Sequence, residues 1–386
     1  MVEVSEITKC QPILNLRRDA AGRVSLFAGC YPLHAGDGAS PVSTGAHSAG
    51  KLTGMDLFVL TRRLVDIESI TPNEGAVGEF LFAELGRRGF DSRKMPVDGA
   101  RNNVLATWPG HPRPEIVFST HMDTVPPFMR SSEDETRIFG RGSCDAKGII
   151  ATQIVAAEKL REAGVFVGLL FLVGEETNSI GALTANQHPM GACFMINGEP
   201  TDNRLALASK GSLHVVLTAR GKMAHSAYPE LGESAIDKLV EALHRLHAMT
   251  LPETADVGAS TKNVGTIEGG RARNIIPDFA RAELFYRLVG PGEELRRLIV
   301  EAVGSLVEVE FTREAPFMRM HTIDGLPTMV AAFTTDVPSL TNWGAPLLIG
   351  PGSIHVAHTE GEFVEKAQLA EAVELYCVIA QRLSSG

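Results

Sequence analysis

The stretch from residue 115 to residue 148 constrains the fold of this chain most. It opens with an apolar run, residues 116–118, that is typical of a buried strand and leads to His121 and Asp123. A polar loop and a Gly-Arg-Gly turn follow, and Asp145 then precedes a helical pattern. Two carboxylates and a histidine therefore gather just past a strand end, which is where open α/β sheets bind their ligands.

Polar side chains also follow three further expected strands. They are Glu175 and Glu176 after residues 168–173, Glu199 after 192–196, and His358 after the strand at 346–350. Adjacent carboxylates repel, and several of them in one cleft do not all stay ionised unless a cation compensates them. Two histidines with several carboxylates suit Zn²⁺, and Mn²⁺ or Co²⁺ are also possible. The pattern favours two divalent metal ions about 3.5–4 Å apart.

Each of these residues also has an ordinary structural explanation. An Asp before a helix is most often an N-cap, a His-x-Asp segment is usually a local hydrogen-bonded pair, and Glu-Glu pairs are mostly solvated. Glu199 stands before a proline and fits a turn, and His358 fits an exposed loop. Taken singly, these explanations are favoured. Together they require five coincidences at strand ends, so the common site is the better hypothesis.

The remaining pattern predicts a two-part α/β domain with an insert. Alternating elements are expected as helices at 55–68, 74–88, 146–163, 179–186 and 364–383, and as strands at 103–107, 116–120, 165–173, 192–196 and 346–350. After Gly211 the order becomes β-α-β-β-α-β, which is the ferredoxin-like unit. Its elements are expected at 213–219, 233–249, 263–268, 281–288, 293–303 and 307–312.

These elements set the expected domain boundaries. The catalytic domain is expected at 55–211 and 323–386, around an inserted domain at 212–322. Residues 35–50 are rich in Gly, Ser and Ala, so residues 1–54 are expected to be a disordered leader.

Composition narrows the partners and the location. The formal net charge is −10, which disfavours nucleic acid because phosphate binding needs a basic surface. No apolar stretch approaches the roughly 20 residues of a membrane helix. The chain has five cysteines, an odd number, and no two of them form a C-x-x-C motif. We therefore expect no disulfide framework, and we expect a cytoplasmic location.

Seven motifs then point to one family. The segments FSTHMDTVPP, GRGSCDAKG, GEET, GEPTDNRLALASKG, GKMAHSAYPE, GGRARNIIPD and GPGSIHVAHTEGE resemble, in order, those of the acetylornithine deacetylase, succinyl-diaminopimelate desuccinylase and glutamate carboxypeptidase family of zinc hydrolases. The resemblance covers the chain from Met55 onward. It implies a mixed-sheet α/β catalytic domain with helices on both faces, an inserted α+β ferredoxin-like dimerisation (lid) domain, and a homodimer.

The resemblance also implies roles for individual residues. His121 and Glu199 would bind one metal ion, Glu176 and His358 the other, and Asp145 would bridge them. Asp123 would orient the ring of His121, Glu175 would be the general base, and His225 would reach the site from the partner subunit to stabilise the oxyanion. Cys144 is not expected to act as a nucleophile, because a metal-activated water attacks in this family.

Four residues are expected to contact the substrate. Asn274 and Arg287 match substrate-contacting positions of the family, and Arg287 could clamp an α-carboxylate through two hydrogen bonds. Gly352 would let backbone amides approach the same group, although Gly-Pro-Gly is first of all a turn. Lys210 stands where desuccinylases are richer in arginine, which argues against a dicarboxylate acyl group.

The predicted reaction is hydrolysis of the amide bond of an N-acyl amino acid or small peptide, closest to acetylornithine deacetylase. Succinyl-diaminopimelate desuccinylase, glutamate carboxypeptidase and dipeptidase activities remain open. An inactive metal-binding homologue is disfavoured because Glu175 and all five ligand positions are present. A phosphate-binding module is disfavoured because GRGSCDAKG lacks the order of a phosphate loop.

Overall fold

The computed structural model describes residues 54–385, which belong to one compact unit, Gly54–Gly386. The leader expected at residues 1–54 lies outside the described residues except for Gly54. No helix of residues 54–385 combines the length and the apolar character needed to cross a membrane. The cytoplasmic location stays a prediction.

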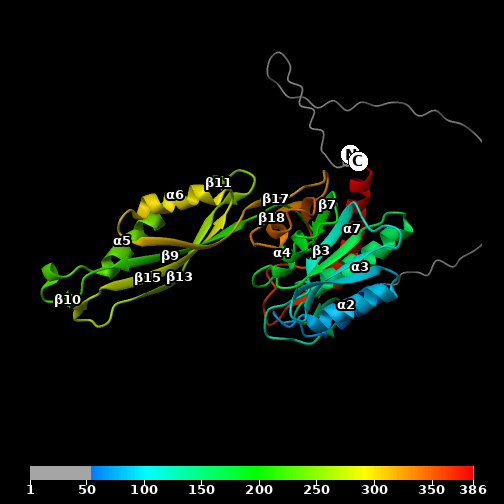
Figure 1. The fold of residues 1–386 in the computed structure, drawn as a ribbon, viewed down its shortest axis with the longest axis horizontal. Helices are drawn as coiled ribbons and strands as arrows, with labels where there is room; N and C mark the ends of the chain where they lie inside the picture. The colour runs from blue at the N-terminus through cyan, green and yellow to red at the C-terminus, as the bar shows by residue number, and fades with distance from the viewer. Residues whose placement is uncertain (1–53, 386) are drawn as a thin grey trace, which may run out of the picture. The chain divides into compact units, whose positions relative to one another are not determined.

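A six-stranded mixed sheet organises the larger part of this unit (Figure 1). Its order is β1(Asp91–Asp98), β2(Arg101–Thr107), β6(Gly168–Leu172), β3(Ile116–His121), β7(Phe194–Asn197) and β19(Ala345–Leu348). Strand β3 runs parallel to β6 and β7, and β19 runs parallel to β7. The carboxyl ends of four strands therefore meet at one edge of the sheet.

Alternating side chains of this sheet enter two cores on its opposite faces. Phe118 of β3 packs into a core that contains residues of α1(Gly54–Val65), α2(Gly75–Arg87), α3(Lys147–Glu162) and α7(Lys366–Ser384). The next residue back, Val117, packs into a second core with α4(Ile180–Asn186) and Trp343. Burial on both faces explains why the central strands are continuously apolar. The prediction of a mixed sheet with helices on both faces is confirmed.

The inserted domain is the expected ferredoxin-like unit. Its elements are β9(Gly211–Arg220), α5(Ala235–Ala248), β13(Thr261–Gly269), β15(Phe279–Leu288), α6(Gly292–Val303) and β16(Glu308–Ala315). The sheet order is β13-β15-β9-β16, and all neighbours are antiparallel. Leu213, Val215 and Leu217 of β9 pack into a core with residues of α5 and α6, so the residues between them belong to the other face of the sheet.

The remaining elements are mostly short and were not expected from sequence. They are β4(Ser132–Glu133), β5(Arg137–Phe139), β8(Leu205–Ser209), β10(Ala224–His225), η1(Pro229–Leu231), β11(Glu253–Thr254), β12(Gly258–Ala259), β14(Ile275–Ile276), β17(Met318–Arg319), β18(Thr328–Ala331), η2(Val337–Ser339) and β20(Phe363–Glu365). Strand β1 was also missed. Only Met95 of β1 is buried, because an edge strand needs few apolar residues.

The described cysteines differ in state. Cys144 and Cys377 are buried free thiols, whereas Cys193 is disulfide-bonded.

Candidate active site

His121 ends strand β3 and is fully buried. Its Nδ1 atom lies 3.0 Å from the backbone oxygen of Asp123, and its Nε2 atom lies 2.9 Å from Oδ1 of Asp145. Burial lowers the pKa of His121, but hydrogen bonds with Asp123 and Asp145 outweigh that effect and hold the pKa well above its usual value. A ring fixed at Nδ1 presents Nε2 toward Asp145, as a ligating histidine requires.

Asp145 lies between two histidines. While Oδ1 faces His121, its Oδ2 atom lies 3.3 Å from Nε2 of His358. His358 Nε2 in turn lies 3.1 Å from Oε1 of Glu176. The ligand atoms of His121, Asp145 and Glu176 all lie within 4.8 Å of one another. One carboxylate thus spans two candidate ligand groups, as a bridging ligand does.

Glu199 follows strand β7 and is also buried. Its Oε1 atom has no hydrogen-bond partner among the described residues. Burial, followed by the negative charge of Asp145, raises the pKa of Glu199 well above its usual value. A buried, unpaired carboxylate oxygen is costly, and a cation at this point removes the cost. The oxygen and nitrogen donors gathered here suit Zn²⁺.

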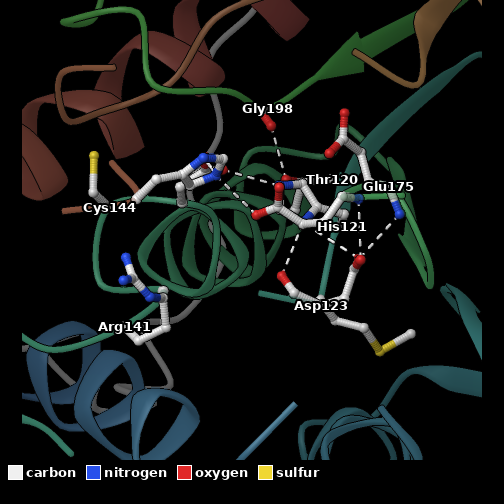
Figure 2. Close-up of polar contacts among 12 residues, drawn as sticks. Thr120, His121, Asp123, Arg141, Cys144, Glu175 and Gly198 are labelled. Carbon is white, nitrogen blue, oxygen red and sulfur yellow. Dashed lines mark hydrogen bonds and ion pairs between the residues drawn. The ribbon is translucent and has the colours of Figure 1, made fainter. Parts of the chain in front are cut away.

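Asp123 joins the end of β3 to the turn after β6 (Figure 2). Its carboxylate accepts hydrogen bonds from Thr71 Oγ1 at 2.8 Å and from the backbone N–H groups of Glu175 at 3.2 Å and Glu176 at 3.1 Å. Burial raises the pKa of Asp123, but hydrogen bonds from His121, Thr71 and Glu176 lower it below its usual value. Asp123 is therefore a fixed anion that holds two candidate ligands.

Glu175 differs from its neighbour Glu176. None of the hydrogen bonds of residues 54–385 involves the Glu175 carboxylate, although its backbone is fixed by Asp123. Burial raises the pKa of Glu175 well above its usual value, and the charges of Glu199 and Asp336 add to the rise. A carboxylate that is free of partners and more basic than usual is suited to proton transfer.

A cavity of about 410 Å³ opens at this cluster. Candidate metal-site residues on its wall are Asp145, Glu175, Glu176, Glu199 and His358. Other wall residues come from the inserted domain, namely Ser212, His214, Phe285, Arg287, Arg313 and Ala315. The cavity therefore joins a carboxylate-rich centre to a cationic surface, as a pocket for an anionic substrate would.

Of the four residues expected to contact the substrate, one lines the cavity. Arg287 lines the cavity, whereas Asn274, Lys210 and Gly352 are not among its wall residues. Lys210 Nζ donates to the Ala259 carbonyl at 2.7 Å. The backbone N–H of Gly352 donates to Gln368 at 3.2 Å. The substrate roles of these three residues stay predictions.

His225 also lies away from the cavity of its own chain. It stands exposed on β10, where its Nδ1 atom accepts a hydrogen bond from the backbone of Ala227 at 3.1 Å. The adjacent strand β14 follows Asn274, whose carbonyl accepts from the backbone of Ser226 at 3.1 Å. His225 and Asn274 are thus neighbours, and neither lines the cavity of its own chain.

Sequence reasoning gave no role to Glu362, which builds the turn that carries Asp145. Its Oε1 atom accepts the backbone N–H groups of Gly142 at 2.9 Å, Cys144 at 3.2 Å and Asp145 at 3.2 Å. Its Oε2 atom pairs with buried Arg141 at 2.5 Å. Glu362 closes the motif that contains His358, but only the tertiary structure shows what it contacts.

Cys144 of the same turn is a buried free thiol. Its thiol contacts the Ser353 carbonyl at 3.4 Å. Burial raises the pKa of the thiol well above its usual value, which keeps it protonated and unreactive.

Comparisons with known proteins identify the family of this chain. Residues 207–308 match the family model described as a peptidase dimerisation domain. A peptidase M20 domain-containing protein of Schizosaccharomyces pombe is 36% identical over 342 residues, covering 86% of each chain. A probable carboxypeptidase of Paracoccidioides brasiliensis is 35% identical, covering 83% of this chain and 84% of its own.

Solved structures share the fold. The aminopeptidase PepT from Bacillus cereus superimposes with a TM-score of 0.74 at 20% identity, covering 87% of this chain and 100% of its own. A tripeptidase from Staphylococcus aureus gives a TM-score of 0.73, also at 20% identity, covering 86% and 100%. Given the curated relatives that match across more than four-fifths of both chains, this chain belongs to the M20 peptidase family and is a metallopeptidase.

Proposed function

We propose that this protein is a metal-dependent exopeptidase that holds two divalent cations, Zn²⁺ by preference and Co²⁺ or Mn²⁺ as substitutes. His121 and Glu199 would hold one ion, Glu176 and His358 the other, and Asp145 would contact both. The observation that carries this proposal is the Asp145 carboxylate, whose two oxygens lie 2.9 Å and 3.3 Å from the two histidines. Buried Glu199, with its unpaired oxygen, supports the same centre.

When bound, the cations would supply Lewis acidity and lower the pKa of a water molecule. Glu175 would accept the proton of the attacking water and pass it to the nitrogen of the leaving amine. Burial raises its pKa, which makes this carboxylate a stronger base than an exposed glutamate. Asp123 would hold the Glu175 backbone and the His121 ring in place during both proton transfers.

The substrate would carry a free α-carboxylate next to the scissile amide. Arg287 lines the cavity and is partly buried, and its planar guanidinium matches a carboxylate. Fungal relatives are named probable carboxypeptidases, which supports this substrate class. Acetylornithine deacetylation, suggested by the motifs, would bring a cationic side chain against Arg287 and Arg313, so we favour the peptidase.

Dimerisation would complete the site. The inserted domain matches a dimerisation domain. On its edge strand β13, Val264 is 41% exposed to solvent and Ile267 is 64% exposed. We infer that a second chain covers part of this domain and that the partner's copy of His225 would reach the cavity. There it would donate a hydrogen bond to the developing oxyanion.

The test is a substrate panel on metal-loaded protein. Dipeptides, tripeptides, N-acetylornithine and acylated glutamates are offered before and after chelation, and metal is then added back. We expect peptides with a free carboxylate to be cleaved only in the presence of metal. Glu175→Gln should retain metal but lose roughly 10²–10⁴-fold in kcat, whereas Glu176→Gln should lose metal as well. Cleavage that is indifferent to chelation contradicts the proposal.

A further inference from the structure

Three cavity residues of the inserted domain form a cross-strand group. His214 on β9 is paired with Phe285 on β15 and with Arg313 on β16. The ring centroids of His214 and Phe285 are 4.7 Å apart, edge to face. Arg287 and Ser212 form the next cross-strand pair. Residues paired in this way share one face of a sheet, and this face is the one that faces the cavity.

A β-bulge brings Arg313 onto that face. The pairing of β16 with β9 shifts between Phe311, opposite Val215, and Arg313, opposite His214. Without the shift, Thr312 would stand opposite His214, and Arg313 would join Phe311 on the face that packs against the helices. Bulges commonly redirect a side chain next to a functional site. Here the bulge adds a guanidinium to the cavity wall.

No acid among residues 54–385 forms an ion pair with Arg313. Its hydrogen bond within residues 54–385 runs from Nη2 to the backbone carbonyl of Thr177 at 3.0 Å. The adjacent acid, Glu314, pairs with Arg296 instead. Arg287 likewise forms no ion pair in the described part of the chain, and its guanidinium lies over the Phe285 ring at 4.7 Å.

The positive charges of Arg313 and Arg287 also affect the pKa of His214. Burial lowers the pKa of His214, and the charges of Arg313 and then Arg287 lower it further. Of the acids on that face, Glu283 is paired with Arg281 at 2.9 Å, and Glu310 stands opposite Val216. A neutral His214 can still donate one hydrogen bond to an anion.

The charges of the cavity then exceed what one substrate carboxylate can balance. Four carboxylates line it, Asp145, Glu175, Glu176 and Glu199, and two divalent cations would neutralise them. Arg287 and Arg313 remain. An α-carboxylate on Arg287 leaves the exposed guanidinium of Arg313 on the cavity wall free to pair with a second anion.

We infer that Arg313, with His214 beside it, forms a second anion subsite, so that the preferred substrates carry an acidic group in addition to the α-carboxylate. This inference rests on the proposed peptidase function and narrows its substrate class. Lys210, by contrast, donates to the Ala259 carbonyl and does not line the cavity. The acidic group could belong to the residue on either side of the scissile bond.

The experiment compares acidic and neutral dipeptides of the same shape. Ala-Glu is compared with Ala-Gln, and Glu-Ala with Gln-Ala, on metal-loaded wild type and on Arg313→Gln. We expect the acidic-to-neutral ratio of kcat/KM to exceed one for at least one pair in the wild type and to fall roughly 10- to 100-fold in Arg313→Gln. Arg297→Gln is the control, because it removes an equal charge from an exposed pair with Glu301.

Two outcomes overturn the subsite. One is a wild type with no preference for either acidic dipeptide, and the other is a preference that survives in Arg313→Gln. Cleavage of neutral dipeptides in these cases leaves the peptidase function intact. If no peptide is cleaved at all, the proposed peptidase function is wrong. The subsite is then tested separately by calorimetry, which compares the binding of glutarate, with two carboxylates, with that of butyrate, with one. Weaker glutarate binding in Arg313→Gln than in Arg297→Gln supports it, and equal binding overturns it.

Discussion

The Oδ2 atom of Asp123 lies 3.1 Å from the backbone nitrogen of Glu176, which donates a hydrogen bond to it. The same carboxylate lies 3.5 Å from Nδ1 of His121. One buried acid outside the proposed ligand set therefore fixes two residues of that set, one at the end of β3 and one in the turn after β6. The ligand geometry depends on this contact as much as on the strands.

Asp123→Asn should weaken metal binding without changing the size of the side chain. The carboxylate accepts three hydrogen bonds from Thr71, Glu175 and Glu176, and the amide nitrogen that replaces one of its two oxygens cannot accept a hydrogen bond. We expect Zn²⁺ affinity to fall about 10- to 100-fold, measured by competition with a chromogenic chelator. Asp91→Asn, at the exposed start of β1, should leave the affinity unchanged. Equal affinity in both variants would refute the orienting role of Asp123.

Glu362→Gln should destabilise the fold. The change leaves Arg141, which is 1% exposed, without its anionic partner. It also weakens the acceptor of three backbone N–H groups in the turn before α3. We expect the free energy of unfolding to fall by about 3–5 kcal/mol, measured by urea denaturation of the metal-free protein. Glu301→Gln, in an exposed pair with Arg297, should cost less than about 1 kcal/mol.

Acid stability should depend on Glu84 of helix α2. Hydrogen bonds from Arg87 and then Arg88 lower the pKa of Glu84 from 4.5 to about 2 in the folded protein. Because the folded pKa is depressed, the stabilisation is fully present above pH 4.5 and disappears as the pH falls toward about 2. Glu84→Gln should therefore lower the free energy of unfolding at pH 7 and differ less from wild type at pH 3.

Urea denaturation at the two pH values measures this difference. The control is Glu79→Gln on the same helix, where the exposed Glu79 carboxylate pairs with Lys94. This variant should show little change at either pH. A deficit in Glu84→Gln that is as large at pH 3 as at pH 7 contradicts the assignment.

His225→Ala should lose activity and keep its metal. His225 is exposed on β10 and does not line the cavity of its own chain, so its contribution would come through a partner chain. Mixing His225→Ala with Glu175→Gln should restore part of the peptidase activity, because some heterodimers contain one intact site. The readouts are kcat on a cleaved dipeptide and metal content. Mixtures as inactive as the separate variants would exclude a role across subunits.

The larger features of the fold were predictable because they depend on local patterns. Buried strands such as β3 and β6 are continuously apolar, and α5 follows a period of about 3.6 residues. Alternation along β9 indicated a sheet with one covered face. The edge strand β1 was missed, since its few apolar residues give no clear period.

The features of the site likewise fall into those that the sequence shows and those that only the tertiary structure shows. The sequence by itself determined which residues are chemically able to hold cations, because His121, Asp145, Glu176, Glu199 and His358 each follow a strand end or a glycine-rich turn. Only the tertiary structure decided which partners hold them in place and which residues complete the cavity. Glu362 reaches the turn of Asp145 from more than two hundred residues away, and a bulge in β16 turns Arg313 toward His214. Contacts between distant segments and shifts of strand register leave no periodic signal in a sequence, because they depend on how complete elements pack against one another.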